Sequence, residues 1–383
     1  MSKIKVLAVF GTRPEAIKMA PLVEELKKRE QIYCQVAVTA QHRQMLDQVL
    51  SLFNIVPDYD LDIMTQGQNL FDITTRALNG LENVFEVAKP DVVLVHGDTT
   101  TTFVGALAAF YKKISVGHVE AGLRTFNKWL PFPEEMNRKL TSSLADLHFA
   151  PTLTARQNLL SEGIDPELIF VTGNTVIDAL KTTVKDNYTF STKILNEIDY
   201  DVKKVILVTA HRRENLGEPL RNICLGLRDF VKNNPEAIIV YPVHMNPKVI
   251  DVAFNILGDC DRVYLLSPIA TDEMHNLMAR CYFVMTDSGG LQEEAPSLGK
   301  PVLVLRKETE RPEAVKAGTV KIIGTDRDKV FEEASMLFYD ESQYLKMATA
   351  VNPYGDGSAS RRIAESLLFF KGMVHNRPDE FDK

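Results

Sequence analysis

Charged residues gather at the points where the sequence predicts strands to end. Short apolar runs lead into Asp98, Glu120, His211 and Asp287. In open parallel α/β sheets, ligands bind in the crevice beyond the carboxyl ends of the strands. Because these four positions fall in both halves of the chain, they predict a catalytic cleft between two domains.

Three carboxylates assigned to this cleft, Asp98, Glu120 and Glu134, have the chemistry for proton transfer. Carboxylates held close together in a partly dry site shift one another's pKa, which provides proton donors and acceptors together. Glu134 and Glu135 also open a predicted helix, where acids stabilise the first turn by about 0.3–1 kcal/mol each. Stabilisation of the helix start explains the presence of one glutamate well, but it explains two adjacent glutamates only in part. The set therefore indicates acid–base chemistry near an anionic leaving group.

Two strand-to-helix junctions have the features of anion sites. The first places Arg13 in the turn and Lys18 one helical turn further on. The second offers Ser288 as a helix cap and the N–H groups of Gly289 and Gly290, which can approach a diphosphate closely. An ordinary turn with a solvated arginine remains the alternative for the first junction.

The residues after the second junction add charge of both signs. Glu293 and Glu294 lie in the first turn of the predicted helix, where helix-dipole compensation and hydrogen bonding to a sugar diol explain them equally well. Arg306 and Arg311 follow nearby. The positive charge around His211, within HRREN, favours a functional role for this histidine over a structural one.

Apolar runs of strand length alternate with stretches of helical period through most of the chain, which predicts βαβ units and parallel sheets. The alternation breaks at the polar segment 181–203 and then resumes. We therefore expect an α/β fold of two doubly wound Rossmann-like domains facing a central cleft. The expected boundaries are 1–180 for the first domain, 181–203 for the inter-domain region and 204–357 for the second domain, which would bind the nucleotide. The amphipathic segment 358–374 is expected to form a helix that packs across the domains.

Composition narrows the class of protein. A chain of 383 residues fits two domains, and its net charge of −7 argues against nucleic acid as the main partner. No apolar stretch reaches the length of about 18 residues that a membrane helix needs, so no membrane association is predicted. The four cysteines contain no Cys-x-x-Cys pair, which favours a reducing cytoplasm and predicts neither a disulfide framework nor a zinc site. His118 and Glu120 have the His-x-Glu spacing of zinc deaminases, but the Pro-Cys-x-x-Cys partner is missing, so no metal is predicted there.

Taken together, these motifs closely resemble those of the non-hydrolysing bacterial UDP-N-acetylglucosamine 2-epimerases. The matching stretches include FGTRPEAIKMAPL, VLVHGDTTTTF, GHVEAGLRT, PFPEEMNR, TAHRRENLG and TDSGGLQEEAPSLGKPVLVLR. The resemblance implies a glycosyltransferase-B-like fold that binds a UDP-sugar between two domains, without nicotinamide or metal. It further implies reversible conversion of UDP-N-acetylglucosamine (UDP-GlcNAc) to UDP-N-acetylmannosamine (UDP-ManNAc). In this family UDP is eliminated across C1 and C2 to give 2-acetamidoglucal, and is added back after C2 is protonated on its other face.

The resemblance also implies roles for individual residues. The acid–base candidates are Asp98, Glu120 and Glu134, and His211 would assist the departure of UDP. The implied substrate contacts are Arg13, Lys18, Ser288, Gly289, Gly290, Glu294 and Arg311.

Bacterial members are activated by UDP-GlcNAc at a second, adjacent site. The positions that match it are Gln41, Gln44, Arg212 and His244, with Glu134 at its border. Gly67 stands where an arginine can occur in the family, and this difference predicts weaker effector binding. The resemblance also implies a cytoplasmic homodimer whose product supplies N-acetylmannosamine for a cell-surface polysaccharide.

Three other functions compete with this interpretation. A hydrolysing epimerase would release free N-acetylmannosamine, but the bacterial-type motifs run throughout the chain and no kinase domain is appended. A glycosyltransferase of similar fold would leave C2 unchanged and would not require three acids. A UDP-sugar sensor would need only the binding groups, whereas this chain also has Asp98, Glu120, Glu134 and His211.

Overall fold

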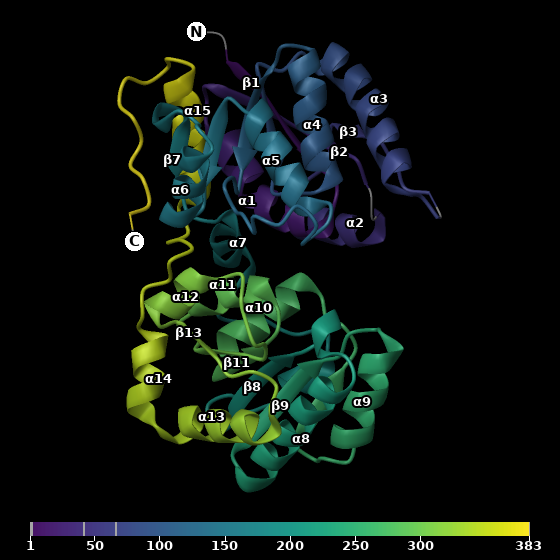
Figure 1. Cartoon of the computed structure of the whole chain (residues 1–383), viewed down its shortest axis with the longest axis vertical. Helices are drawn as coiled ribbons and strands as arrows, with labels where there is room; N and C mark the ends of the chain where they lie inside the picture. The colour runs from purple at the N-terminus through teal and green to yellow at the C-terminus, as the bar shows by residue number, and fades with distance from the viewer. Residues whose placement is uncertain (1–2, 41–42, 66, 383) are drawn as a thin grey trace. The chain divides into compact units, whose positions relative to one another are not determined.

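The computed structural model describes residues 3–40, 43–65 and 67–382, which form two compact units (Figure 1). The first unit contains the residues up to Thr182 and those from Tyr354 onward, and the second contains Thr183–Pro353. Almost all of the segment 181–203 therefore belongs to the second unit. Thr183, for example, bonds to His275 Nδ1 at 2.7 Å, and the backbone N–H of Thr192 donates to Glu273 at 2.8 Å.

The first unit is built on a parallel sheet of order β3-β2-β1-β4-β5-β6-β7. Its strands are β1 (Ile4–Phe10), β2 (Ile32–Val38), β3 (Tyr59–Asp60), β4 (Val92–His96), β5 (Ser115–Val119), β6 (Leu147–Ala150) and β7 (Ile169–Val171). All five residues of β4 are buried, as expected for a parallel strand covered on both faces. The strand order reverses between β1 and β4, which is the position where ligands bind in sheets of this kind.

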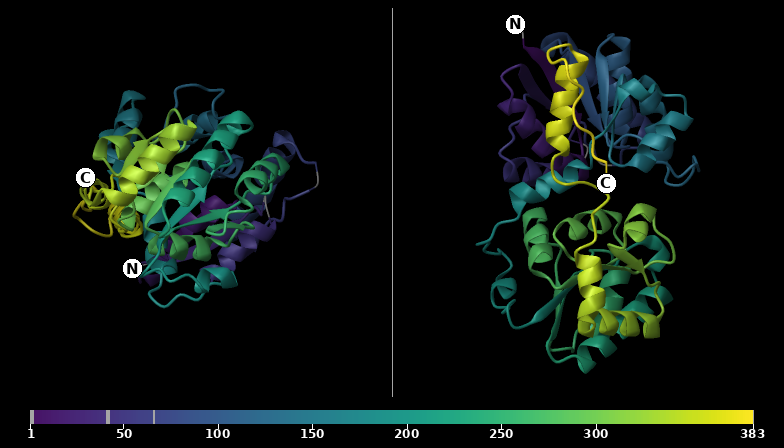
Figure 2. Two further views of the ribbon diagram at one scale, coloured as in Figure 1. Left: turned by 90° about the horizontal axis from the view of Figure 1, so that it is seen from below. Right: turned by 90° about the vertical axis from the view of Figure 1, so that its left-hand side faces the viewer.

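Helices cover this sheet on both faces. They are α1 (Arg13–Lys28), α2 (Arg43–Leu52), α3 (Leu70–Ala88), α4 (Thr100–Tyr111), α5 (Glu134–Leu144), α6 (Leu153–Ser161), α7 (Thr175–Thr183) and α15 (Ala359–Phe370). Helix α15 lies along the first unit in the right-hand view of Figure 2, and its Ile363 and Leu367 share a buried core with Leu22 of α1. The opposite core packs α3 and α4 against the sheet.

The second unit repeats this plan with a parallel sheet of order β10-β9-β8-β11-β12-β13. Its strands are β8 (Lys204–Thr209), β9 (Ala237–Pro242), β10 (Val263–Leu266), β11 (Phe283–Thr286), β12 (Val302–Val304) and β13 (Val320–Ile322). Its helices are α8 (Glu218–Asn233), α9 (Pro247–Leu257), α10 (Thr271–Arg280), α11 (Gly289–Ser297), α12 (Pro312–Ala317), α13 (Arg327–Tyr339) and α14 (Glu341–Ala348). The order reverses between β8 and β11, so the prediction of two doubly wound α/β domains is confirmed.

Among the described residues, no helix combines the length and the apolar character needed to cross a membrane.

Candidate active site

The loop between β1 and α1 is organised by the buried side chain of Glu15. Its Oε2 accepts hydrogen bonds from the N–H groups of Gly11 at 3.1 Å and Thr12 at 2.8 Å. Its Oε1 accepts from the Thr99 hydroxyl at 2.7 Å, which ties the start of α1 to the start of α4. Gly11 is required because an added Cβ would lie only 1.9 Å from the Thr39 hydroxyl oxygen. Burial raises the pKa of Glu15, although the Thr12 and Thr99 hydrogen bonds oppose the shift.

This turn places the two cations that the sequence singled out. Arg13 is the first residue of α1 and its side chain is exposed. Lys18, one turn further along, is directed at the carboxylate of Glu120, with Nζ 2.6 Å from Oε2 and 2.8 Å from Oε1. The first unit thus leaves Arg13 facing solvent and uses Lys18 to neutralise a buried acid.

Glu120 lies just beyond β5 in a left-handed backbone conformation, with φ of 62°, and only 8% of the residue is exposed. The strand register sets Val119 opposite His96, and His96 Nε2 lies 2.8 Å from Glu120 Oε2. Burial alone would raise the pKa of Glu120, but Lys18 and His96 outweigh it and hold the pKa well below its usual value. The carboxylate is therefore ionised at neutral pH.

Asp98 lies in the turn after the neighbouring strand β4. Burial lowers the pKa of His118 to about 3, so this ring is neutral and its Nε2 donates to the carbonyl oxygen of Gly97 at 2.7 Å. The Asn137 side chain donates to the carbonyl oxygen of Asp98 at 2.8 Å. The Asp98 carboxylate pairs with the Arg138 guanidinium of α5. Two acids, Asp98 and Glu120, are thus held at the ends of adjacent strands.

The two glutamates that open α5 have different surroundings. Glu135 is fully buried and accepts hydrogen bonds from the backbone N–H groups of Thr125 and Phe126, both at 3.0 Å, so it anchors the preceding loop. Glu134 Oε2 is buried, and no hydrogen-bond donor reaches it from the described part of the chain. Glu135 therefore anchors the loop, whereas Glu134 Oε2 has no such contact among the described residues.

In the second unit, the loop after β8 is held by Asp287, which is fully buried at the end of β11. Asp287 Oδ2 accepts from the N–H groups of His211 at 2.7 Å and Arg212 at 2.8 Å. Desolvation is the main cause that lowers the pKa of His211; Asp287 opposes it, and His244 and Arg212 add to it. The imidazole of His211 is therefore neutral at neutral pH in the unliganded protein.

The start of α11 combines a helix N-terminus with two guanidinium groups. Ser288 is the N-cap residue, and a Cβ on Gly289 would lie 3.7 Å from Arg311 Nη2 and 3.8 Å from Arg212 Nη2. Arg212, predicted for the second site, therefore lies beside the same helix end as Arg311. Backbone N–H groups, the helix dipole and two arginines together favour a diphosphate here.

The glutamates of α11 also separate by role. Glu293 is buried and pairs with the Arg311 guanidinium. Glu294 is partly exposed; its Oε1 lies 3.2 Å from the position that a Cβ on Gly290 would take, and its Oε2 lies 3.6 Å from His275 Nε2. The sequence left two roles open for these glutamates, helix-dipole compensation and hydrogen bonding to a sugar diol. Because Glu293 pairs with Arg311, the second role is narrowed to Glu294.

Known proteins match this chain over nearly its whole length. The family described as UDP-N-acetylglucosamine 2-epimerase matches residues 24–368. The chain belongs to this 2-epimerase family. A UDP-N-acetylglucosamine 2-epimerase from Bacillus subtilis is 58% identical over 381 residues, covering 100% of this chain and 99% of the relative.

Two solved structures of 2-epimerases extend the comparison. The UDP-GlcNAc 2-epimerase from Neisseria meningitidis, bound to UDP-GlcNAc, is 52% identical and covers 95% of this chain and 100% of its own, with a TM-score of 0.86. The enzyme from Methanocaldococcus jannaschii, in complex with UDP-GlcNAc and UDP, is 33% identical and covers 96% of this chain and 100% of its own, with a TM-score of 0.75. The expected glycosyltransferase-B-like fold is therefore confirmed.

Several residues that organise this 2-epimerase site were not among the site residues predicted from the sequence. They are Glu15, His96, Glu135, Arg138 and Asn137. Each of them lies within or beside a motif that was recognised. Their partners, however, come from other strands and helices, so spacing along the chain did not reveal their contacts.

Part of the predicted activator site lies outside the described residues. Gln41 is not described, and Gln44 lies in α2 without a described side chain. Gly67 occupies an exposed turn with φ of 74° before α3. Two members of this set have defined contacts: Arg212 is hydrogen-bonded to Asp287, and the ring of His244 stacks on that of His211.

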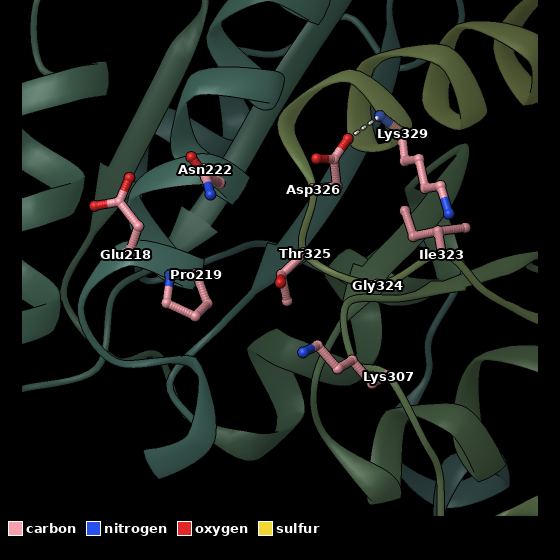
Figure 3. Close-up of a pocket in the computed structure, with 9 residues that line it drawn as sticks. All are labelled: Glu218, Pro219, Asn222, Lys307, Ile323, Gly324, Thr325, Asp326 and Lys329. Atoms are coloured by element: carbon pink, nitrogen blue, oxygen red, sulfur yellow. Dashed lines mark hydrogen bonds between the residues drawn. The ribbon is translucent and has the colours of Figure 1, made fainter.

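A pocket of about 340 Å³ lies beyond β12 and β13 in the second unit of this 2-epimerase (Figure 3). Lys307, Thr325 and Lys329 line it together with the first turn of α8. None of the residues predicted for catalysis or substrate binding belongs to this pocket, so the site is defined by the strand ends described above.

Proposed function

We propose that this protein interconverts UDP-GlcNAc and UDP-ManNAc by inverting C2, without net hydrolysis. The observation that carries the proposal is the ionised carboxylate of Glu120, buried against Lys18 and His96 at a strand end of the first unit. A buried carboxylate kept in its charged form is in the protonation state that a general base requires. Membership of the 2-epimerase family identifies the sugar carbon concerned.

In the first step, the bond between C1 and the UDP oxygen breaks and its electron pair leaves with UDP. The C2 proton is weakly acidic, so positive charge at C1 must develop before this proton is removed. The N–H groups of Gly289 and Gly290, the Ser288 side chain and the Arg311 guanidinium would stabilise the departing diphosphate. His211 and Arg13 would add hydrogen bonds and charge to the same group.

In the second step, a base takes the C2 proton, and the electrons of that bond form the double bond of 2-acetamidoglucal. Glu120 is the base that the structure favours, since Lys18 and His96 keep it ionised. Return of a proton to the opposite face of C2 and re-addition of UDP at C1 complete the inversion. Asp98 and Glu134 are the candidates for the acid on that face.

We assign the ribose hydroxyls to Glu294, because Glu293 is already paired with Arg311. The Neisseria relative binds UDP-GlcNAc, which supports the same substrate for this chain. We further propose a homodimer in the cytoplasm whose product supplies N-acetylmannosamine for a surface polysaccharide. The free thiols of all four cysteines are consistent with a reducing compartment.

A second UDP-GlcNAc is proposed as an activator, contacting Gln41, Gln44, Arg212 and His244. The ligand pair in the Methanocaldococcus structure supports binding of more than one nucleotide in the family. Gly67 would weaken this site compared with family members that have an arginine at this position.

Proton NMR of the purified protein with UDP-GlcNAc in deuterated buffer, without added cofactor, tests the proposal. We expect UDP-ManNAc with deuterium at C2 and little free UDP. Free N-acetylmannosamine together with UDP would instead identify a hydrolysing epimerase. Glycosylation of an added acceptor with C2 unchanged would identify a transferase, and binding without C2 exchange would identify a sensor.

A further inference from the structure

His96 is a buried imidazole whose ring has one close polar contact in the described part of the chain. It is the last residue of β4 and is 4% exposed. Its Nδ1 is buried and has no hydrogen-bond partner among the described residues. Its Nε2 lies 2.8 Å from Glu120 Oε2, although the ring is not aligned for a linear hydrogen bond. The contact with Glu120 therefore accounts for the presence of a polar ring here.

Packing alone does not require a histidine at this position. Burying a polar ring without full hydrogen bonding is unfavourable, and an apolar side chain would fill the same space without that penalty. The backbone of His96 is held independently, since its carbonyl oxygen accepts from the Thr102 hydroxyl at 2.5 Å. The strand end would thus keep its place with another side chain.

We propose that His96 is a positioning residue for C2 epimerisation, which holds the carboxylate of Glu120 in place and in its ionised form. This inference rests on the proposed function, because it assigns Glu120 to proton transfer. Lys18 and His96 approach Glu120 from α1 and β4. Lys18 contacts both oxygens, whereas His96 contacts only Oε2, so the imidazole fixes the rotation of the carboxylate about its last bond.

The charged groups around His96 and Glu120 are consistent with a positioning role for His96. His96 also interacts electrostatically with the buried side chain of Glu15, where it opposes the rise in pKa that burial causes. Asp98 is neutralised separately by Arg138. His118, the other ring near His96, is neutral and bonded to Gly97. Lys18 and His96 are therefore the positive or hydrogen-donating side chains that face Glu120 among the described residues.

Replacement of His96 by Leu and by Gln tests the inference. For His96→Leu, the acid limb of the kcat/KM profile should move up by about one pH unit or more, because the carboxylate loses a polar contact that lowers its pKa. Its kcat near neutral pH should fall about tenfold, less than for loss of an acid–base residue. KM should stay within about twofold, since the ring is buried and only 4% of the residue is exposed. His96→Gln should recover most of both effects, because its side-chain amide can donate at the Nε2 position.

His148→Leu is the matched control, since His148 is also a buried histidine and lies on β6 of the same sheet. Its removal should leave the acid limb in place. If His96→Leu proves unfolded by thermal denaturation, His96→Met replaces it as the apolar variant. A wild-type acid limb and kcat in the apolar variant would overturn the inference, as would a His96→Gln enzyme no better than the apolar one. Failure of the wild-type protein to epimerise UDP-GlcNAc would instead reject the proposed function.

Discussion

The imidazole rings of His211 and His244 stack face to face, with centroids 5.0 Å apart and planes inclined by 7°. His211 follows β8 and His244 follows β9, which are adjacent strands of the second sheet. We assign His211 to the departure of UDP and His244 to the activator. A ligand that contacts His244 would therefore change the surroundings of His211 directly, with no rearrangement of the sheet.

His244→Ala should uncouple activation from catalysis. Without the second ring, an activator can no longer act on His211 through the stack, so added UDP-GlcNAc should accelerate turnover of UDP-ManNAc much less than in the wild type. The measurement is the initial rate from UDP-ManNAc against UDP-GlcNAc concentration. His244→Phe keeps an aromatic ring and should retain part of the response. Equal activation of the Ala variant and the wild type would show that the stack does not transmit the signal.

Binding of the nucleotide sugar should be accompanied by proton uptake at His211. Desolvation, opposed by Asp287 and aided by His244 and Arg212, lowers the pKa of this ring in the unliganded protein. A bound diphosphate favours the imidazolium and raises this pKa. The bound state thus holds more protons than the free protein. The affinity for UDP-GlcNAc should therefore rise as the pH falls from the pKa of His211 in the complex toward its lower pKa in the free protein.

Isothermal titration of UDP-GlcNAc into an Asp98→Asn background, in buffers of different ionisation enthalpy near pH 6, measures this uptake. His211→Asn in the same background is the control and should remove it. Proton release, or an uptake that persists in the control, would contradict the assignment.

The alternation of apolar runs and helical segments predicted both sheets, because buried parallel strands are visible as continuous apolar stretches. The strand-end rule then selected Asp98, Glu120, His211 and Ser288 correctly as residues at the carboxyl edges of the two sheets. These inferences need only local sequence, since each depends on where one strand ends.

The contacts across strands could not be read in this way. His96 meets Glu120 only because the β4–β5 register sets His96 against Val119. Adjacent glutamates pose the same difficulty, since neighbouring residues on a helix point roughly 100° apart and only the packing decides which one is buried. Glu293 takes the structural role in α11 because Arg311 lies on its side of the helix. Glu135 takes it in α5 because the preceding loop lies on its side.

Removal of the charge from Asp98 or Glu120 should abolish most of the turnover. Asp98→Asn and Glu120→Gln are each expected to reduce kcat at least about a hundredfold, the lower end for loss of an acid–base group. Both side chains keep their size, so circular dichroism should show an intact fold. The measurement is the rate of deuterium exchange at C2 together with UDP-ManNAc formation. Near-normal exchange in a folded variant would remove that residue from the catalytic set.

The adjacent residues Glu134 and Glu135 should respond to the same substitution in opposite ways. Glu135→Gln replaces an acceptor of two backbone hydrogen bonds with an amide that offers one acceptor oxygen, so it should lower the free energy of unfolding by about 1–3 kcal/mol. Glu134→Gln should leave stability within about 0.5 kcal/mol while cutting kcat at least about a hundredfold. Urea denaturation and steady-state kinetics on the two variants separate the effects. A Glu134→Gln enzyme that is unstable but active per folded molecule would show that Glu134 serves the helix start and not the reaction.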